Sequence, residues 1–145
     1  MITIERNEQR TRSRRKVIYA ALISAFLVVW ATGMVAGLSA GACRNDRHSG
    51  EDKVARCDLS LAVNVFRHVS QIERARASII HLERGIGLFQ IGDFSTAQSA
   101  FETAYSDAKQ SRYSSDLGYL FSRIQMVNDI EIKRLWVEVA KVNGG

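Results

Sequence analysis

The side chains that could carry catalysis or bind a metal are few, and their spacing fits neither role. His68 and His81 are thirteen residues apart, so they cannot form the i,i+4 pair that holds a metal on one helix face. Cys57 has no nearby histidine to activate its thiol. Gly85-Ile86-Gly87 lacks the strand and the third glycine of a dinucleotide-binding loop. We therefore expect no catalytic, metal-binding or cofactor-binding residue and predict that the protein is not an enzyme.

Carboxylates occur mainly among arginines on the polar faces of predicted helices. Glu83, Asp129 and Glu131 are in this class. We expect them to form surface ion pairs, each worth about 0.3 kcal/mol because water screens exposed charges.

The two cysteines, Cys43 and Cys57, both follow a long apolar segment. In an oxidising compartment they could form a disulfide, which would stabilise the fold by about 2–3 kcal/mol by closing a short loop. The alternative is two free thiols. Without a matching histidine or cysteine pair, they are a weak signal for a metal site.

The apolar segment is the clearest feature of the chain. Residues 17–43 contain no charged side chain, and residues 10–16 just before them are strongly basic. About 20 helical residues cross the hydrocarbon core of a bilayer, and the basic flank stays in the cytoplasm. We predict a cytoplasmic tail (residues 1–16), a transmembrane helix (17–42), and everything beyond on the far side. This places the protein in a bacterial inner membrane with its C-terminal domain in the periplasm.

Three interpretations of this segment remain open. We favour a retained signal anchor, since the run exceeds the roughly 7–15 apolar residues of a secretory signal. A cleaved signal is the second, because Ala40-Gly41-Ala42 has small residues in an A-x-A arrangement and residues 13–18 (Ser-Arg-Arg-Lys-Val-Ile) resemble the twin-arginine export signal. The third is lipidation at Cys43, although Ala40 replaces the usual leucine of a lipobox.

Gly33, Gly37 and Gly41 are spaced four apart and share one face of the apolar helix. Because glycine has no side chain, a second helix can approach closely, so this face is a candidate for helix packing in the membrane. The second helix would belong to a partner or to another copy of the chain in a homodimer. Alternatively, the glycines reflect only the high frequency of glycine in membrane helices.

Net charge excludes nucleic acid as the expected partner. The chain carries +5, of which residues 1–16 contribute +4 and residues 43–145 only +1. A nucleic-acid interface needs clustered cations on one face, and the C-terminal part has no such excess.

The C-terminal part has the periodicity of helices and no proline. We expect a polar, flexible linker at 43–57 and a helical domain at 58–145. A first helix begins at Asp58 and ends at Gly92, a second runs from Asp93 or Ser95 to about Gln110, and a third begins at Ser114 or Ser115 and continues to the C-terminus. The buried face of the first helix is predicted to contain Val65, Phe66, Val69, Ile72, Ile79, Leu82, Ile86 and Phe89. That of the second is predicted to contain Phe94, Ala97, Ala100, Phe101, Ala104 and Ala108. That of the third is predicted to contain Leu117, Leu120, Phe121, Ile124, Val127, Leu135 and Val139.

One part of this domain resembles a single tetratricopeptide repeat, a 34-residue helix–turn–helix unit, at about Ser78 to Ser111. The resemblance rests on Gly85, Gly92, Asp93, Phe94, Ala97, Phe101 and Ala104. Leu88, His81 and Lys109 depart from the tyrosine, tryptophan and proline of that pattern. It implies an antiparallel helical domain that binds peptides or proteins in the concave surface between helices, with Arg84, Leu88 and Gln90 as partner-binding residues.

These expectations combine into an all-α protein with a single transmembrane helix and a small tetratricopeptide-like domain. We expect a non-catalytic protein–protein interaction module that serves a membrane protein complex, or its exported subunits, as accessory subunit or assembly factor. The alternative is an exported soluble helical module that serves as the small subunit of a redox enzyme.

Overall fold

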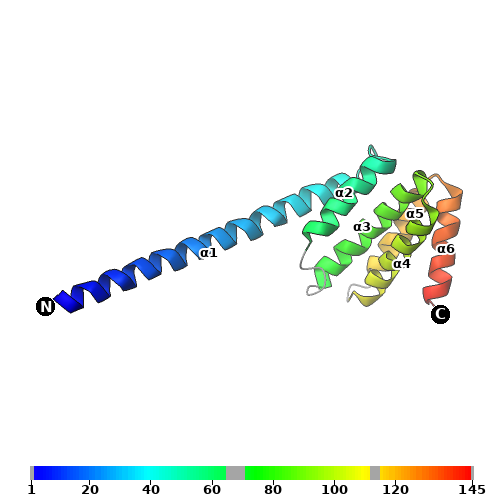
Figure 1. Cartoon of the computed structure of the whole chain (residues 1–145). Coiled ribbons are helices and arrows are strands. Elements are labelled where there is room, and N and C mark those ends of the chain that lie inside the picture. Colours follow the sequence, from blue (N-terminus) through cyan, green and yellow to red (C-terminus); the bar gives the residue numbers. More distant parts are fainter. Residues whose placement is uncertain (1, 65–70, 112–114, 145) are drawn as a thin grey trace. The chain divides into compact units, whose positions relative to one another are not determined.

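The computed structural model describes residues 2–64, 71–111 and 115–144, and every element in those ranges is an α-helix (Figure 1). The elements are α1 (Ile2–Cys43), α2 (Gly50–Val63), α3 (Gln71–Gln90), α4 (Phe94–Gln110), α5 (Ser115–Met126) and α6 (Ile130–Gly144). The all-α prediction is confirmed. The chain divides into two compact units, Met1–Met34 and Val35–Gly145, which are described separately.

The first unit contains most of α1. The segment Arg15–Cys43 is long and apolar enough to cross a membrane. Within it, Thr32 donates its hydroxyl hydrogen to the carbonyl oxygen of Val29 at 2.9 Å. Such internal hydrogen bonds let a polar side chain exist in hydrocarbon, where no water can satisfy it.

The second unit contains the end of α1 and the five other described helices. In it α3 lies between α2 and α4, α4 also packs on α6, and α5 touches α3, α4 and α6 (Figure 1). Helices α2 and α3 are antiparallel, because the backbone N–H of Gly50 at the start of α2 donates to the side chain of Gln90 at the end of α3.

The turn between α3 and α4 agrees with its prediction. Gly92 has φ +84°, and the N–H groups of Gly92 and Asp93 donate to the carbonyls of Phe89 and Leu88. This pair of bonds is the Schellman motif, which favours glycine at the left-handed position. The Asp93 side chain then accepts the N–H of Thr96 at 3.2 Å and caps α4.

The prediction of a flexible linker at 43–57 is wrong for most of these residues, because α2 begins at Gly50. Glu51 and Asp52 complement the helix dipole in its first turn. The buried residues of α2 are Lys53, Cys57 and Ser60, and its C-cap residue Asn64 is buried as well. Since these residues are polar or small, this helix has no apolar periodicity for the sequence to reveal.

The expected single helix from Asp58 to Gly92 is also wrong. Helix α2 ends at Val63 with Asn64 as its C-cap, and α3 begins at Gln71. Four residues named above, Val65, Phe66, His68 and Val69, lie outside the described residues.

The third expected helix is two helices, α5 and α6. Between them the Asp129 side chain accepts the N–H groups of Glu131 at 2.9 Å and Ile132 at 3.3 Å. Asp129 is thus the cap of α6 and not a surface ion-pair partner. Helix α5 begins at Ser115, and Ser114 is outside the described residues.

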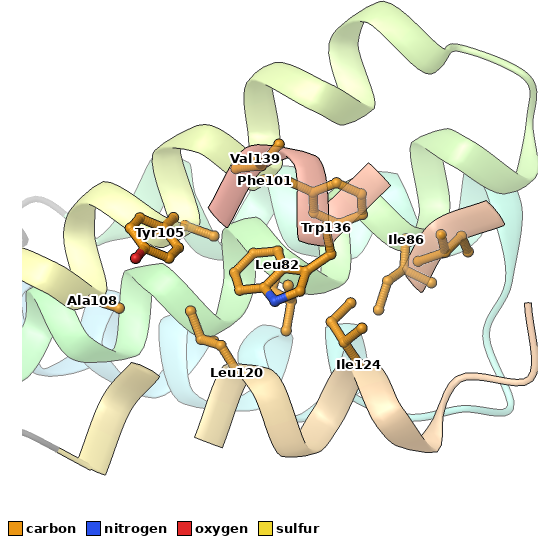
Figure 2. Packing of buried hydrophobic residues seen from close by; sticks show 11 residues of the cluster. Leu82, Ile86, Phe101, Tyr105, Ala108, Leu120, Ile124, Trp136 and Val139 are labelled. Atoms are coloured by element: carbon orange, nitrogen blue, oxygen red, sulfur yellow. The ribbon is translucent and has the colours of Figure 1, made fainter. Parts of the chain in front are cut away.

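The main hydrophobic core joins α3, α4, α5 and α6 (Figure 2). Trp136 of α6 is 1% exposed and lies near Leu82 and Leu120. Its ring meets Phe101 edge-on at 5.9 Å and Phe121 at 5.6 Å between centroids. The predicted buried set of α4 is confirmed except for Phe94, which is 56% exposed and packs against Phe89. Phe121 is only partly covered, at 39% exposed, and Ile72, predicted to be buried, is 50% exposed.

Gly85 sets the distance between α3 and α4. A Cβ atom at Gly85 would lie 2.5 Å from Cε1 of Phe101, whereas one at Gly118 in α5 would meet nothing within 4 Å. The ring of Phe101 is fully buried and cannot move aside without disturbing the core. Close approach of these helices therefore requires glycine at residue 85.

We expect Gly85→Ala to lower the free energy of unfolding by about 1–3 kcal/mol, as over-packing does, despite the better helix propensity of alanine. The matched control, Gly118→Ala, should be neutral or stabilising by up to about 1 kcal/mol, since its methyl group enters open space. Urea denaturation of the detergent-solubilised full chain, followed by near-UV circular dichroism, measures both. Equal effects of the two variants would contradict this account of the contact.

Candidate functional site

A disulfide joins the end of α1 to α2. The sulfur atoms of Cys43 and Cys57 are 2.08 Å apart, and both residues are fully buried. They pack with Ile80 of α3 and with Ala40 and Leu61 on either side. The predicted pairing is therefore present, and it fixes α2 against the last turns of α1.

A second contact between α1 and α2 lies closer to the N-terminus of α1, so the two helices are antiparallel where they meet. The hydroxyl of Ser60 donates to the carbonyl oxygen of Ala36 at 3.4 Å. Ser39, which is largely buried, donates its own hydroxyl hydrogen to Val35 at 2.7 Å. The segment from Val35 to Cys43 is thus packed as part of the helical domain.

The centre of the domain contains a buried carboxylate with two cations. Glu83 of α3 is fully buried. Its Oε2 accepts from Lys53 Nζ of α2 at 2.6 Å, and its Oε1 accepts from Arg123 Nε of α5 at 2.5 Å. Arg123 Nη2 also donates to Oε2 at 3.2 Å, so the guanidinium grips both carboxylate oxygens. We call these three residues the Glu83 cluster.

A second carboxylate completes the charge balance. Asp46, in the turn between α1 and α2, pairs with Arg123 and lies 3.9 Å from Lys53 Nζ. Asp46 itself is largely exposed. Two cations therefore face two carboxylates, so each buried charge has the oppositely charged partner that burial requires.

Arg123 keeps its charge in the Glu83 cluster. The hydrogen bond to Glu83 raises the pKa of the Arg123 guanidinium above its already high ordinary value. A group that stays charged at every working pH cannot transfer a proton, so Arg123 can only position and neutralise. The chemistry of this cluster is that of a structural clamp.

The prediction that Glu83 forms an exposed surface ion pair is therefore wrong. Glu131 behaves as expected, with Arg134 3.9 Å away and both side chains well exposed. His48 pairs with Asp52 at 2.5 Å, and a hydrogen bond from Arg56 lowers the pKa of the Asp52 carboxyl. Within the described residues, no group of three His, Cys, Asp or Glu is placed to hold a metal ion.

The three residues expected to bind a partner make contacts within the domain. Arg84 pairs with Asp58 of α2 at 2.5 Å, and Gln90 accepts the N–H of Gly50. Leu88 is 4% exposed and packs with Ala97 and Ala100. Helix α2 covers the face of α3 on which a ligand was expected. The prediction that Leu88 contacts a partner is wrong, because no surface of it is left for one.

The three glycines of the apolar helix lie on α1. Gly33, Gly37 and Gly41 are exposed, and a Cβ atom at each would meet nothing within 4 Å. Their packing against another helix stays a prediction.

Comparison with known proteins finds no family model, no curated protein and no solved structure that matches this chain. The tetratricopeptide resemblance itself remains a prediction.

The residues that sequence reasoning missed are Asp46, Lys53 and Arg123. Glu83 carried a usable signal, since it lies between Leu82 and Ile86 on the buried stripe of α3. A charged residue on such a stripe needs a buried partner. The partner could not be named, because Lys53 and Arg123 are 30 and 40 residues away in the chain.

Glu83→Gln should lower the free energy of unfolding by about 3–5 kcal/mol, because the buried Lys53 ammonium loses its carboxylate partner at 2.6 Å and keeps Asp46 at 3.9 Å. The matched control is Glu73→Gln, which removes an i,i+3 pair with the exposed Arg76 and should cost at most about 0.5 kcal/mol. Denaturation curves of both variants in detergent measure the difference. A small, equal loss in both would show that the cluster is not required for folding.

Replacing both cysteines, as Cys43→Ser with Cys57→Ser, should lower the free energy of unfolding by about 2–3 kcal/mol, since the 14-residue separation closes a loop in the unfolded chain. Urea denaturation with and without a thiol reductant provides the control. Reductant should bring the wild-type curve to that of the variant and leave the variant unchanged. A reductant effect on the variant would contradict this assignment.

Proposed function

We propose that the protein is a membrane-anchored interaction module that serves a larger membrane protein complex as an accessory subunit or assembly factor. In this proposal α1 crosses a bacterial inner membrane with its basic end in the cytoplasm, and the helical domain lies in the periplasm. The observation that carries it is an apolar helix on which a Cβ atom at Gly33, Gly37 or Gly41 would meet nothing within 4 Å among the residues that the structure describes.

The glycine face is what a partner helix would use. In lipid, helices associate through close packing, because hydrocarbon offers no hydrophobic drive between them. Gly37 and Gly41 belong to the unit that contains the domain, yet neither is covered by it. A transmembrane helix of the partner can therefore pack there while the domain contacts its exported part.

Exposed apolar side chains on the domain support a second contact. Met126 is 62% exposed and Ile130 75% exposed, on either side of the turn between α5 and α6. Anchoring both proteins in one membrane raises their effective concentration, so a modest contact of this kind is sufficient.

Two observations favour the retained anchor over a cleaved or lipidated N-terminus. Ala40 packs against the buried disulfide, so cleavage after Ala42 would remove part of the folded domain. The sulfur of Cys43 is bonded to Cys57 and is not available for a lipid. An oxidised pair also fits the periplasm better than the reducing cytoplasm.

Gly37→Leu should reduce recovery of the partner by about tenfold, corresponding to about 1.4 kcal/mol of lost helix packing, because its side chain separates the two helices. The measurement is purification in mild detergent with quantitative mass spectrometry of the proteins that accompany the chain.

The matched control is Ala31→Leu, which adds the same side chain about 120° around the helix and should leave recovery unchanged. Equal recovery with both variants would remove the glycine face from the proposal. The intact mass of the purified protein tests the exported alternative, which requires a product that lacks the residues before Cys43.

A further inference from the structure

We infer that the exposed face of α5 is a contact between two copies of this chain. It consists of Gly118, Tyr119, Phe121, Ser122 and Gln125, all of them exposed, and we call it the α5 face. This contact belongs to the helical domain alone, and it goes beyond the contact of α1 with a partner protein that we proposed above.

The α5 face carries no charge. Helix α5 contains two charged residues, and both are engaged in its own chain: Arg123 is buried against Glu83, and Asp116 accepts the hydroxyl hydrogen of Ser111. Tyr119 and Phe121, by contrast, are 36% and 39% exposed. A surface that combines aromatic groups with a lack of charge is typical of the core of a protein–protein interface.

The middle of the α5 face has the spacing of a helix-packing seam. Gly118, Ser122 and Gln125 follow one another at intervals of four and three residues, as the residues along which two helices pack do. At 100° per residue, Tyr119 and Phe121 border this line on its two sides. A second helix can therefore approach closely at Gly118, while the two aromatic rings cover its flanks.

Gly118 makes no contact in its own chain that would require glycine. Glycine inside a helix costs about 0.5–1 kcal/mol relative to alanine. In α3 a neighbouring helix explains it, since added Cβ atoms at Gly85 and Gly87 would lie 2.5 Å from Phe101 and 3.0 Å from Val54. An added Cβ atom at Gly118 would meet nothing within 4 Å among the described residues. We therefore expect the neighbour of Gly118 to come from outside the chain.

Tyr119 can be covered by a second copy without losing its hydrogen bond. Its hydroxyl oxygen accepts from Arg44 Nη2 at 2.7 Å, and the guanidinium carbon lies 5.5 Å from the centre of the ring. A phenol that already has its partner in the same chain can be buried at little cost. Arg44 itself is exposed and belongs to the polar rim that surrounds such an interface.

The absence of charge favours a second copy over a different protein. Contacts between different proteins use complementary charges, which steer the partners together and exclude wrong ones. When two copies place the α5 face against itself across a twofold axis, no like charges of α5 meet, because the face is neutral. Copies that α1 holds in one membrane also meet at a raised effective concentration, a point that rests on the proposed anchoring.

Cysteine cross-linking tests the inference on the full chain in mild detergent and in phospholipid vesicles. Ser122→Cys places a thiol in the middle of the α5 face, near its counterpart in the second copy, so a short bismaleimide should link the two. Ser99→Cys is the matched control on the exposed side of α4 and should give only background dimer. The added thiol reacts selectively, because Cys43 and Cys57 are buried and bonded to each other.

A second substitution connects the cross-link to the α5 face. Added to Ser122→Cys, Gly118→Leu should lower the yield of dimer by about tenfold, which corresponds to about 1.4 kcal/mol of lost packing. Near-UV circular dichroism checks that this variant folds, as the open space at Gly118 leads us to expect. Gly118→Ala, which favours the helix, should also weaken the dimer without destabilising the fold at protein concentrations that keep the chain monomeric.

Three results would overturn the inference. Equal yields at residues 99 and 122 would mean that the copies meet only by random collision. A cross-link at residue 122 that survives Gly118→Leu would mean that the copies touch elsewhere. A thiol at residue 122 that maleimide cannot reach in native membranes, and that forms no dimer, would mean that a different protein covers the α5 face.

Gly37→Leu separates this inference from the proposed function. That variant should lose the partner of α1 and keep the cross-link at residue 122, because the two faces lie on different helices. Loss of the cross-link in Gly37→Leu would show that α1 holds the copies together, and would overturn the inference as well. Full recovery of the partner with an intact cross-link would count against the proposed function alone.

Discussion

The fold depends on the need of one buried carboxylate, Glu83, for cations that its own helix does not supply. Lys53 comes from α2 and Arg123 from α5, so the carboxylate has both of its cationic donors only when both helices are docked on α3. A buried ion cluster is no more stabilising than apolar side chains of the same volume would be, since desolvation offsets the attraction. Its contribution is specificity. An apolar face tolerates small shifts in register, whereas a carboxylate with two fixed donors does not. The interaction thus determines which faces of α2 and α5 meet α3.

The polar contact face of α2 also determines how the domain is joined to α1. The fully buried residues of α2, Lys53, Cys57 and Ser60, are polar or small. Its apolar packing comes from Val54 and Leu61, which are partly buried, so hydrophobic burial contributes little to holding α2 in place. The disulfide and the ion cluster replace that missing burial, one toward α1 and the other toward α3. In place of a flexible tether, the residues after the apolar segment form a packed junction.

The parts of the fold that the sequence predicted are those governed by local rules. Gly92 and Asp93 specify the turn between α3 and α4 by themselves, through a left-handed glycine and a capping carboxylate. The alanine and phenylalanine stripe of α4 likewise follows from period alone. Helix α2 could not be recognised in this way, because its buried face is polar and its partners are distant in the chain. Asp129 was misread for a related reason: a capping aspartate and a surface aspartate look identical until the helix boundary is known.

The covering of α3 by α2 changes where recognition can occur. In an open helical hairpin, the first helix would present residues such as Arg84 and Gln90 to a ligand, but here both are bonded to α2. Displacing α2 would expose Glu83 and leave Lys53 without its carboxylate, at a cost of several kcal/mol, so a ligand of ordinary affinity cannot enter there. The partner contact that we propose would therefore use surfaces that α2 leaves open. On α1 this is the glycine face, and on the domain it is the exposed apolar residues at the turn between α5 and α6. The packing of α2 on α3 thus opposes the binding of a peptide at that face of α3.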